Sequence, residues 1–95
     1  MRTAIRKPSL LKILIVENEP MVSKLLQSQL QRLGYQIAGI AADSATAIQT
    51  ARDTKPGLII MDLRLTDPET GVDDPEEGIK ATIAIQKAYP TPVIL

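Results

Sequence analysis

Four short apolar segments alternate with stretches in which apolar residues recur at helical spacing. These segments cover residues 11–16, 35–40, 58–61 and 93–95, and the second alternates with polar residues more than the others do. Short apolar segments bounded by turn residues predict strands that are buried in a sheet. Strand and helix alternate three times before the last strand, which is typical of parallel strands joined by right-handed helical crossovers. The pattern therefore predicts an α/β fold.

The first two predicted helices have recognisable ends. Pro20 suits the first turn of a helix, and Gly34 suits the position just after one. Asp43 or Ser44 is expected to cap the second helix, which ends before Pro56. The apolar stripes are formed by Val22, Leu25, Leu26, Leu30 and Leu33 in the first helix and by Ala47, Ile48 and Ala51 in the second.

A third helix is predicted from Glu76 or Glu77 to about Ala88, where Pro90 and Pro92 follow. One of its faces carries Ala81, Ile85 and Ala88, whereas Ile79 and Ile83 lie off that face. The pattern leaves open which side of this helix is buried.

The composition excludes several classes of protein. A chain of 95 residues with 44% apolar residues forms one globular domain at most. Without cysteine or histidine it has no disulfide, thiol catalysis, structural zinc or serine–histidine triad, and a cytoplasmic location is expected. Eleven basic and eleven acidic residues cancel, which argues against a dedicated nucleic-acid binder. No apolar segment approaches the ~20 residues needed to span a membrane.

Charged residues gather in two places. Basic residues open the chain, and residues 1–10 are predicted to be a flexible arm ahead of a domain over residues 11–95. Lys12 interrupts what would otherwise be the apolar core of a signal peptide. Residues 66–77 hold six acids and no base, which is typical of a solvated loop. An EF-hand role for this loop fails because Gly71 comes one position early and Pro68 intrudes.

Oxygen-bearing side chains follow two of the predicted strands. Asp62 comes directly after the buried segment 58–61, and Glu17 and Asn18 follow the first strand. If these strands are neighbours, with the second strand on the far side of the first, their carboxyl ends form a ligand crevice. Oxygen ligands of this kind suit Mg²⁺, and Asp62 is a candidate nucleophile for phosphoryl transfer. An Asp after a strand is also often only a cap or a solvated edge.

Three stretches together resemble the receiver domain of two-component response regulators. They are KILIVENE at residues 12–19, LIIMDLRL at 58–65 and YPTPVIL at 89–95, together with Gly78 and Ile79. The resemblance implies a flavodoxin-like (CheY-like) parallel sheet of order 2-1-3-4-5 with flanking helices. It also implies that Asp62 accepts phosphate from a histidine kinase or phosphotransfer protein. Mg²⁺ would then be held by Glu17, Asn18, Asp62 and the backbone carbonyl of Arg64.

The chain departs from the family pattern in three ways. Asn18 stands where the family usually has a second acid, so weaker Mg²⁺ binding is expected. The acidic loop 66–77 is longer than usual and is expected to repel a kinase. The chain stops in its fourth strand, so the last helix–strand–helix portion, the switch Ser/Thr and the phosphate-binding Lys are expected to be missing.

Three functional interpretations follow from these features. The leading one is phosphorelay signalling through Asp62, with no enzymatic activity beyond self-phosphorylation and dephosphorylation there. The second is a truncated or degenerate receiver that acts as a non-phosphorylated protein-interaction module, and the third is a small flavodoxin-like ligand binder. A homodimer through the exposed edge of the fourth strand is also possible, whereas nucleic-acid and membrane contacts are not expected.

Overall fold

Four parallel strands form the central sheet in a computed structural model that describes residues 11–67 and 69–95. The order is β2-β1-β3-β6, and each neighbouring pair is parallel. The predicted α/β fold and the predicted order of its four strands are confirmed. The strands are β1 (Lys12–Val16), β2 (Gln36–Ala41), β3 (Leu58–Met61) and β6 (Val93–Ile94). The arm predicted over residues 1–10 lies outside the described residues.

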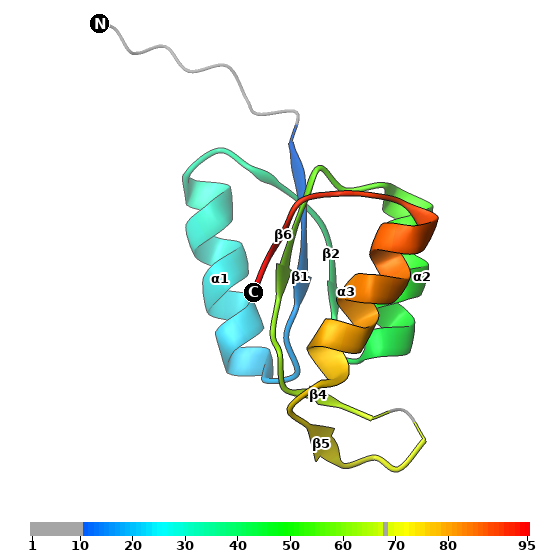
Figure 1. Cartoon of the computed structure of the whole chain (residues 1–95). Helices are drawn as coiled ribbons and strands as arrows, with labels where there is room; N and C mark the ends of the chain where they lie inside the picture. The colour runs from blue at the N-terminus through cyan, green and yellow to red at the C-terminus, as the bar shows by residue number, and fades with distance from the viewer. Residues whose placement is uncertain (1–10, 68) are drawn as a thin grey trace, which may run out of the picture.

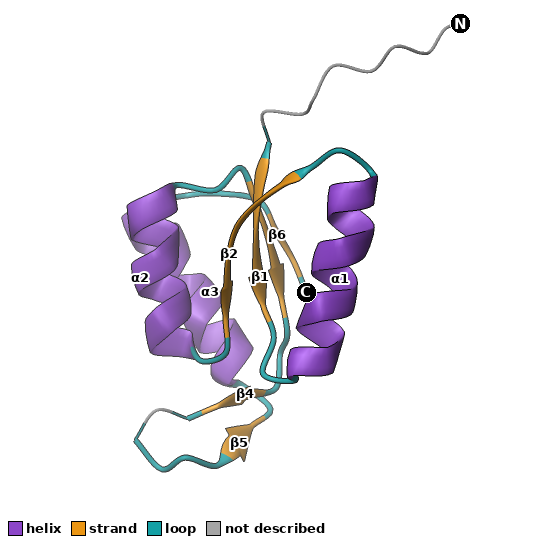
Figure 2. Cartoon of the chain, turned by 180° about the vertical axis from the view of Figure 1, so that it is seen from behind, coloured by secondary structure: helices purple, strands orange, loops and turns teal. Residues whose placement is uncertain are grey.

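Three helices cover the sheet in two layers. Helix α1 (Pro20–Arg32) lies on one face, and α2 (Ser44–Thr54) and α3 (Glu77–Ala88) lie side by side on the other (Figures 1 and 2). The main core fills the space between the sheet and α2 and α3. Its buried residues are Leu14, Val16, Ala41, Ala47, Ala51, Ile59, Met61, Leu65, Ala81 and Ile85. No helix of the described residues is long and apolar enough to cross a membrane.

The helix ends follow the signals in the sequence. Pro20 is the first residue of α1, and Gly34 lies just beyond its end with φ +97, a value that favours glycine. The Asp43 carboxylate caps α2 by accepting a 2.7 Å hydrogen bond from the amide of Thr46. At the other end of α2, Lys55 adopts a left-handed conformation with φ 48.

The structure shows which side of α3 is buried. Ala81 and Ile85 are buried, whereas Ile79 is 43% exposed and Ile83 is 52% exposed. The buried side is therefore the one that carries Ala81 and Ile85, although Ala88, which shares that face, is exposed. Ala88 is the last residue of α3.

The stripe of α1 is buried only along its middle. Leu26 and Leu30 are half-buried, whereas Leu25 is 60% exposed and Leu33 is 56% exposed. Among the described residues, α1 is the single helix on its face of the sheet, so no neighbouring helix covers the flanks of its stripe.

The acidic segment is structured rather than a plain loop. Its strands β4 (Leu65–Thr66) and β5 (Asp73–Asp74) pair in antiparallel fashion. Gly71, at φ +74, supplies a backbone conformation that the turn requires. Leu65 is fully buried and anchors the hairpin to the main core, which fixes the position of the acidic strand β5.

Candidate functional site

The predicted site lies where the order of the strands reverses. The chain passes from β1 to β2 on one side and reaches β3 on the other side of β1. Val16 pairs with Met61 in register, so the residues that follow them emerge beside each other at the carboxyl edge of the sheet. The amide of Asp62 donates a 2.9 Å hydrogen bond to the carbonyl of Val16, which fixes the backbone there. This is the crevice position of an open α/β sheet.

Glu17 and Asp62 are brought together at this edge. Burial is the main cause that raises the pKa of Glu17, and the negative charge of Asp62 raises it further. The amide of Glu19 opposes this rise by donating a 3.1 Å hydrogen bond to Glu17 Oε2. The structure therefore holds two carboxyl groups close enough to repel each other, which is an environment that a cation relieves.

The Asp62 side chain is oriented by its own loop. The backbone amide of Arg64 donates a 3.1 Å hydrogen bond to Asp62 Oδ1, and the Asp62 side chain is half-buried. This bond fixes one carboxylate oxygen and leaves Oδ2 to face other groups. Arg64 therefore belongs to the site through its amide, whereas a role for its carbonyl stays a prediction.

Asn18 is partnered by a residue that the sequence did not single out. Its Nδ2 donates a 3.2 Å hydrogen bond to Oδ1 of Asp73. The hydroxyl of Thr66 also donates to that oxygen, at 3.4 Å, and Thr66 pairs with Asp73 across the hairpin. The acidic hairpin thus reaches the predicted magnesium site. The run of acids was visible in the sequence, but its pairing with Asn18 was not.

A second group of acids lies at the base of the hairpin. Asp67, Asp74 and Glu77 place carboxylate oxygens within 4.8 Å of one another. Lys80 lies 3.5 Å from Asp74, and Glu77, which is only 7% exposed, accepts a hydrogen bond from the hydroxyl of Ser44. A hydrogen bond from the amide of Glu76, followed by the charge of Lys80, lowers the pKa of Asp74. The acids of this cluster already have protein partners in Ser44 and Lys80. The cluster therefore connects the hairpin to α2 and α3.

Gly78 packs directly against the loop that carries Asp62. Its amide donates a 2.8 Å hydrogen bond to the carbonyl of Leu63. A Cβ atom at this position would lie 2.6 Å from Leu63 Cα, closer than real Cβ contacts. The start of α3 therefore supports the Asp62 loop from behind, and only a glycine fits there.

Comparison with known families and proteins gives a consistent result. A family model described as "Response regulator receiver domain" matches residues 13–95. The phyllosphere-induced regulator PhyR of Methylorubrum extorquens is 33% identical over 84 residues, which cover 87% of this chain and 29% of that protein. The transcriptional regulatory protein PdtaR of Mycobacterium tuberculosis is 34% identical over 73 residues, which cover 77% and 35% respectively. The chain spans about a third of the length of these relatives.

Solved structures show the same architecture. The solution structure of the Erythrobacter litoralis PhyR response regulator REC domain gives a TM-score of 0.74 at 36% identity, covering 88% of this chain and 60% of that one. A complex of the anti-anti-sigma factor PhyR with the anti-sigma factor NepR from Bartonella quintana gives 0.74 at 29% identity, covering 86% and 31%. The predicted flavodoxin-like (CheY-like) fold is confirmed.

Proposed function

Because the chain belongs to the response regulator receiver domain family, we propose that it acts in phosphorelay signalling by accepting a phosphoryl group on Asp62. The observation that carries this proposal is the position of Asp62. It stands at the reversal point of the sheet, beside Glu17, with one carboxylate oxygen held by the amide of Arg64. The partner is a cytoplasmic histidine kinase or phosphotransfer protein that presents a phosphohistidine.

The reaction is a transfer of one phosphoryl group between two side chains. A carboxylate oxygen of Asp62 forms the new O–P bond while the N–P bond of the phosphohistidine breaks. The imidazole nitrogen keeps the electron pair of the broken bond and takes up a proton. The amide of Arg64 holds Oδ1, so Oδ2 is the oxygen that we assign to the attack. The product is an acyl phosphate on Asp62, and the partner histidine is restored.

The residues around Asp62 fit a magnesium ion. Glu17 and Asp62 form a pair of neighbouring carboxyl groups, and Asn18 and the backbone carbonyl of Arg64 would add neutral oxygen donors. When bound there, the ion neutralises the negative charge of the incoming phosphoryl group. Asp73 adds a negative charge next to Asn18, which partly offsets the acid that Asn18 replaces.

The proposal is tested by incubating the full 95-residue chain with acetyl phosphate and Mg²⁺ and measuring its intact mass. We expect the addition of one phosphoryl group, which Asp62→Asn abolishes. Asp53→Asn is the matched control, because Asp53 lies on α2 and contacts Gln49 outside the site. An unmodified wild-type chain with a well-dispersed amide spectrum would overturn the proposal.

A second candidate is a receiver that works by protein binding without phosphorylation. Asn18 favours it, because one negative charge of the usual acidic pair is absent and its amide is engaged by Asp73. The Bartonella quintana PhyR was solved with an anti-sigma factor bound, so a regulatory protein of that kind is the partner to test first. Covalent phosphate on Asp62 after acetyl phosphate treatment rules this candidate out.

The edge strand β6 is the contact surface that we propose for a homodimer. Val93 and Ile94 pair with β3 on one side, and Ile94 is 54% exposed. A sheet edge with unpaired backbone groups is a template for another strand. Sedimentation of the full chain tests this, and a monomer at all concentrations contradicts it.

A further inference from the structure

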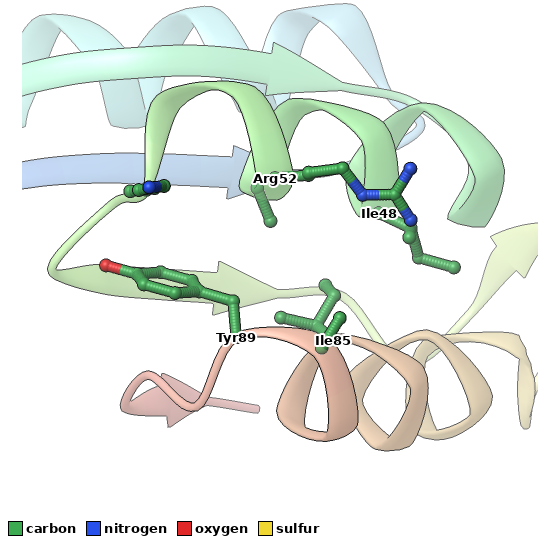
Figure 3. A pocket seen from close by; sticks show the side chains of 7 residues that line it. Ile48, Arg52, Ile85 and Tyr89 are labelled. Carbon is green, nitrogen blue, oxygen red and sulfur yellow. The ribbon is translucent and has the colours of Figure 1, made fainter.

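A cavity of about 220 Å³ lies between α2 and α3. Figure 3 shows Ile48 and Arg52 of α2 on one side of the cavity, with Ile85 and Tyr89 on the other. Ala51 and Ala88 also line it. Because alanine side chains are short, the two helices leave space between them where larger residues would meet. The Tyr89 hydroxyl donates a 3.3 Å hydrogen bond to the carbonyl of Pro56, so its ring serves as an apolar wall.

Two cations, Arg52 and Lys55, line this apolar space. Arg52 lies in the last turn of α2, in one stripe with Ile48, and Lys55 is the residue that caps the carboxyl end of that helix. Neither forms an ion pair with any residue of the described ranges 11–67 and 69–95. The cavity therefore joins apolar walls to positive charge that has no acidic partner within that part of the chain.

We propose that this cavity binds a small monocarboxylate with a compact apolar body, such as an arylalkanoic acid. The apolar body would leave water by contacting Ile48 and Ile85, and the carboxylate would pair with the guanidinium of Arg52. The cavity is smaller than the roughly 300–1,000 Å³ of drug-sized sites, so its ligand has on the order of ten non-hydrogen atoms. This site shares no residue with the Asp62 site and does not depend on phosphorylation.

The test uses the full chain labelled with ¹⁵N, titrated with phenylpropionate and followed by two-dimensional amide NMR. We expect saturable shifts at the amides of Ile48, Arg52, Ile85 and Tyr89. Phenylpropylamine has the same apolar body but carries a positive charge. Acetate has the negative carboxylate of phenylpropionate but lacks its apolar body. The amine is expected to bind about tenfold more weakly, because it meets two like charges. Acetate is expected to give no saturable shift.

Variants test whether the cations bind the ligand or only interact favourably with the dipole at the carboxyl end of the helix. Arg52→Gln keeps a polar side chain but removes the charge, and it should weaken phenylpropionate binding about fivefold. Arg32→Gln is the control, because Arg32 occupies the last turn of α1 on the other face of the sheet. Ala88→Leu fills the cavity and should abolish binding while the spectrum stays dispersed. Equal binding of the amine, full affinity of Arg52→Gln, or no saturable binding would each overturn the inference.

Discussion

Asn18 Nδ2 lies 3.2 Å from Oδ1 of Asp73, a residue 55 positions further along the chain. This hydrogen bond joins the end of β1 to the acidic hairpin. Position 18 has no carboxylate of its own, but the hairpin places the carboxylate of Asp73 next to it. Because the Asn18 nitrogen is occupied by Asp73, its oxygen is the atom left for a cation.

Asp73 is predicted to strengthen magnesium binding at the Asp62 site. Asp73→Asn should weaken Mg²⁺ affinity roughly threefold to tenfold, because it removes a nearby negative charge and releases the Asn18 amide. Titration followed by amide NMR measures this. Glu69→Gln is the control, since it makes the same charge change at an exposed residue elsewhere in the hairpin. Equal effects of the two variants would contradict a specific role for Asp73.

Asn18 is predicted to limit magnesium affinity in the wild-type chain. Asn18→Asp should tighten Mg²⁺ binding about tenfold, since a second full charge joins Glu17. Without the ion the same change should lower stability, because the new carboxylate would stand beside Asp73. Calorimetric titration and thermal unfolding measure the two effects. A wild-type chain that already binds Mg²⁺ at sub-millimolar concentration would refute this prediction.

Glu17 is predicted to make the ion-free chain less stable as the pH rises. Its pKa in the folded state lies above the ordinary value of 4.5 because of burial and the charge of Asp62. Between these two pKa values the folded state binds more protons than the unfolded state, so stability falls with rising pH across that window. Glu17→Gln should therefore be more stable than wild type at neutral pH and show no advantage below the ordinary pKa. Thermal unfolding across this range checks it, and a stability gap independent of pH would be inconsistent with it.

The sequence predicted the parts of the site that depend on buried strands. Asp62 directly follows a segment of four apolar residues, and Glu17 follows another, so the parallel sheet alone brings them to one edge. Asp73 was missed because its strand is two residues long and its pairing depends on a turn near Gly71. Such short pairing leaves no periodic pattern, and the surrounding acids are equally typical of a solvated loop.

The pattern of the sequence also could not predict how exposed the apolar residues of the helices are. The spacing of Leu25 and Leu33 identifies an amphipathic helix, but it does not say how much of the stripe a neighbour covers. Both residues are more than half exposed, because α1 has no helix beside it among the described residues. Periodicity reports which residues share a face, and tertiary packing decides how wide the buried part of that face is.

Leu65 is predicted to hold the acidic hairpin against the core. Its side chain is fully buried, so Leu65→Ala should cost about 2–5 kcal/mol of unfolding free energy through lost contacts and a cavity. Val72→Ala is the control, because Val72 is 63% exposed and should change stability by less than about 0.5 kcal/mol. Urea unfolding measures both variants. A small loss for Leu65→Ala would mean that the hairpin is not anchored in this way.

Gly78 is predicted to be required for the shape of the Asp62 loop. In Gly78→Ala the new Cβ would lie 2.6 Å from Leu63 Cα and 2.9 Å from the Leu63 carbonyl oxygen. These are backbone atoms that cannot rotate away, so the Asp62 loop or α3 must move. Overpacking of this kind costs about 1–3 kcal/mol, although alanine favours a helix by up to ~1 kcal/mol. A net loss of stability in urea, together with slower labelling of Asp62 by acetyl phosphate, is therefore expected.

The control for this substitution is Gly57→Ala. There the new Cβ would meet only side-chain atoms of Leu11, a residue that is 36% exposed and has room to move. We expect it to cost less than about 1 kcal/mol and to leave the labelling rate unchanged. If Gly78→Ala kept both wild-type stability and wild-type labelling, the contact between α3 and the Asp62 loop would have no part in positioning the phosphate acceptor.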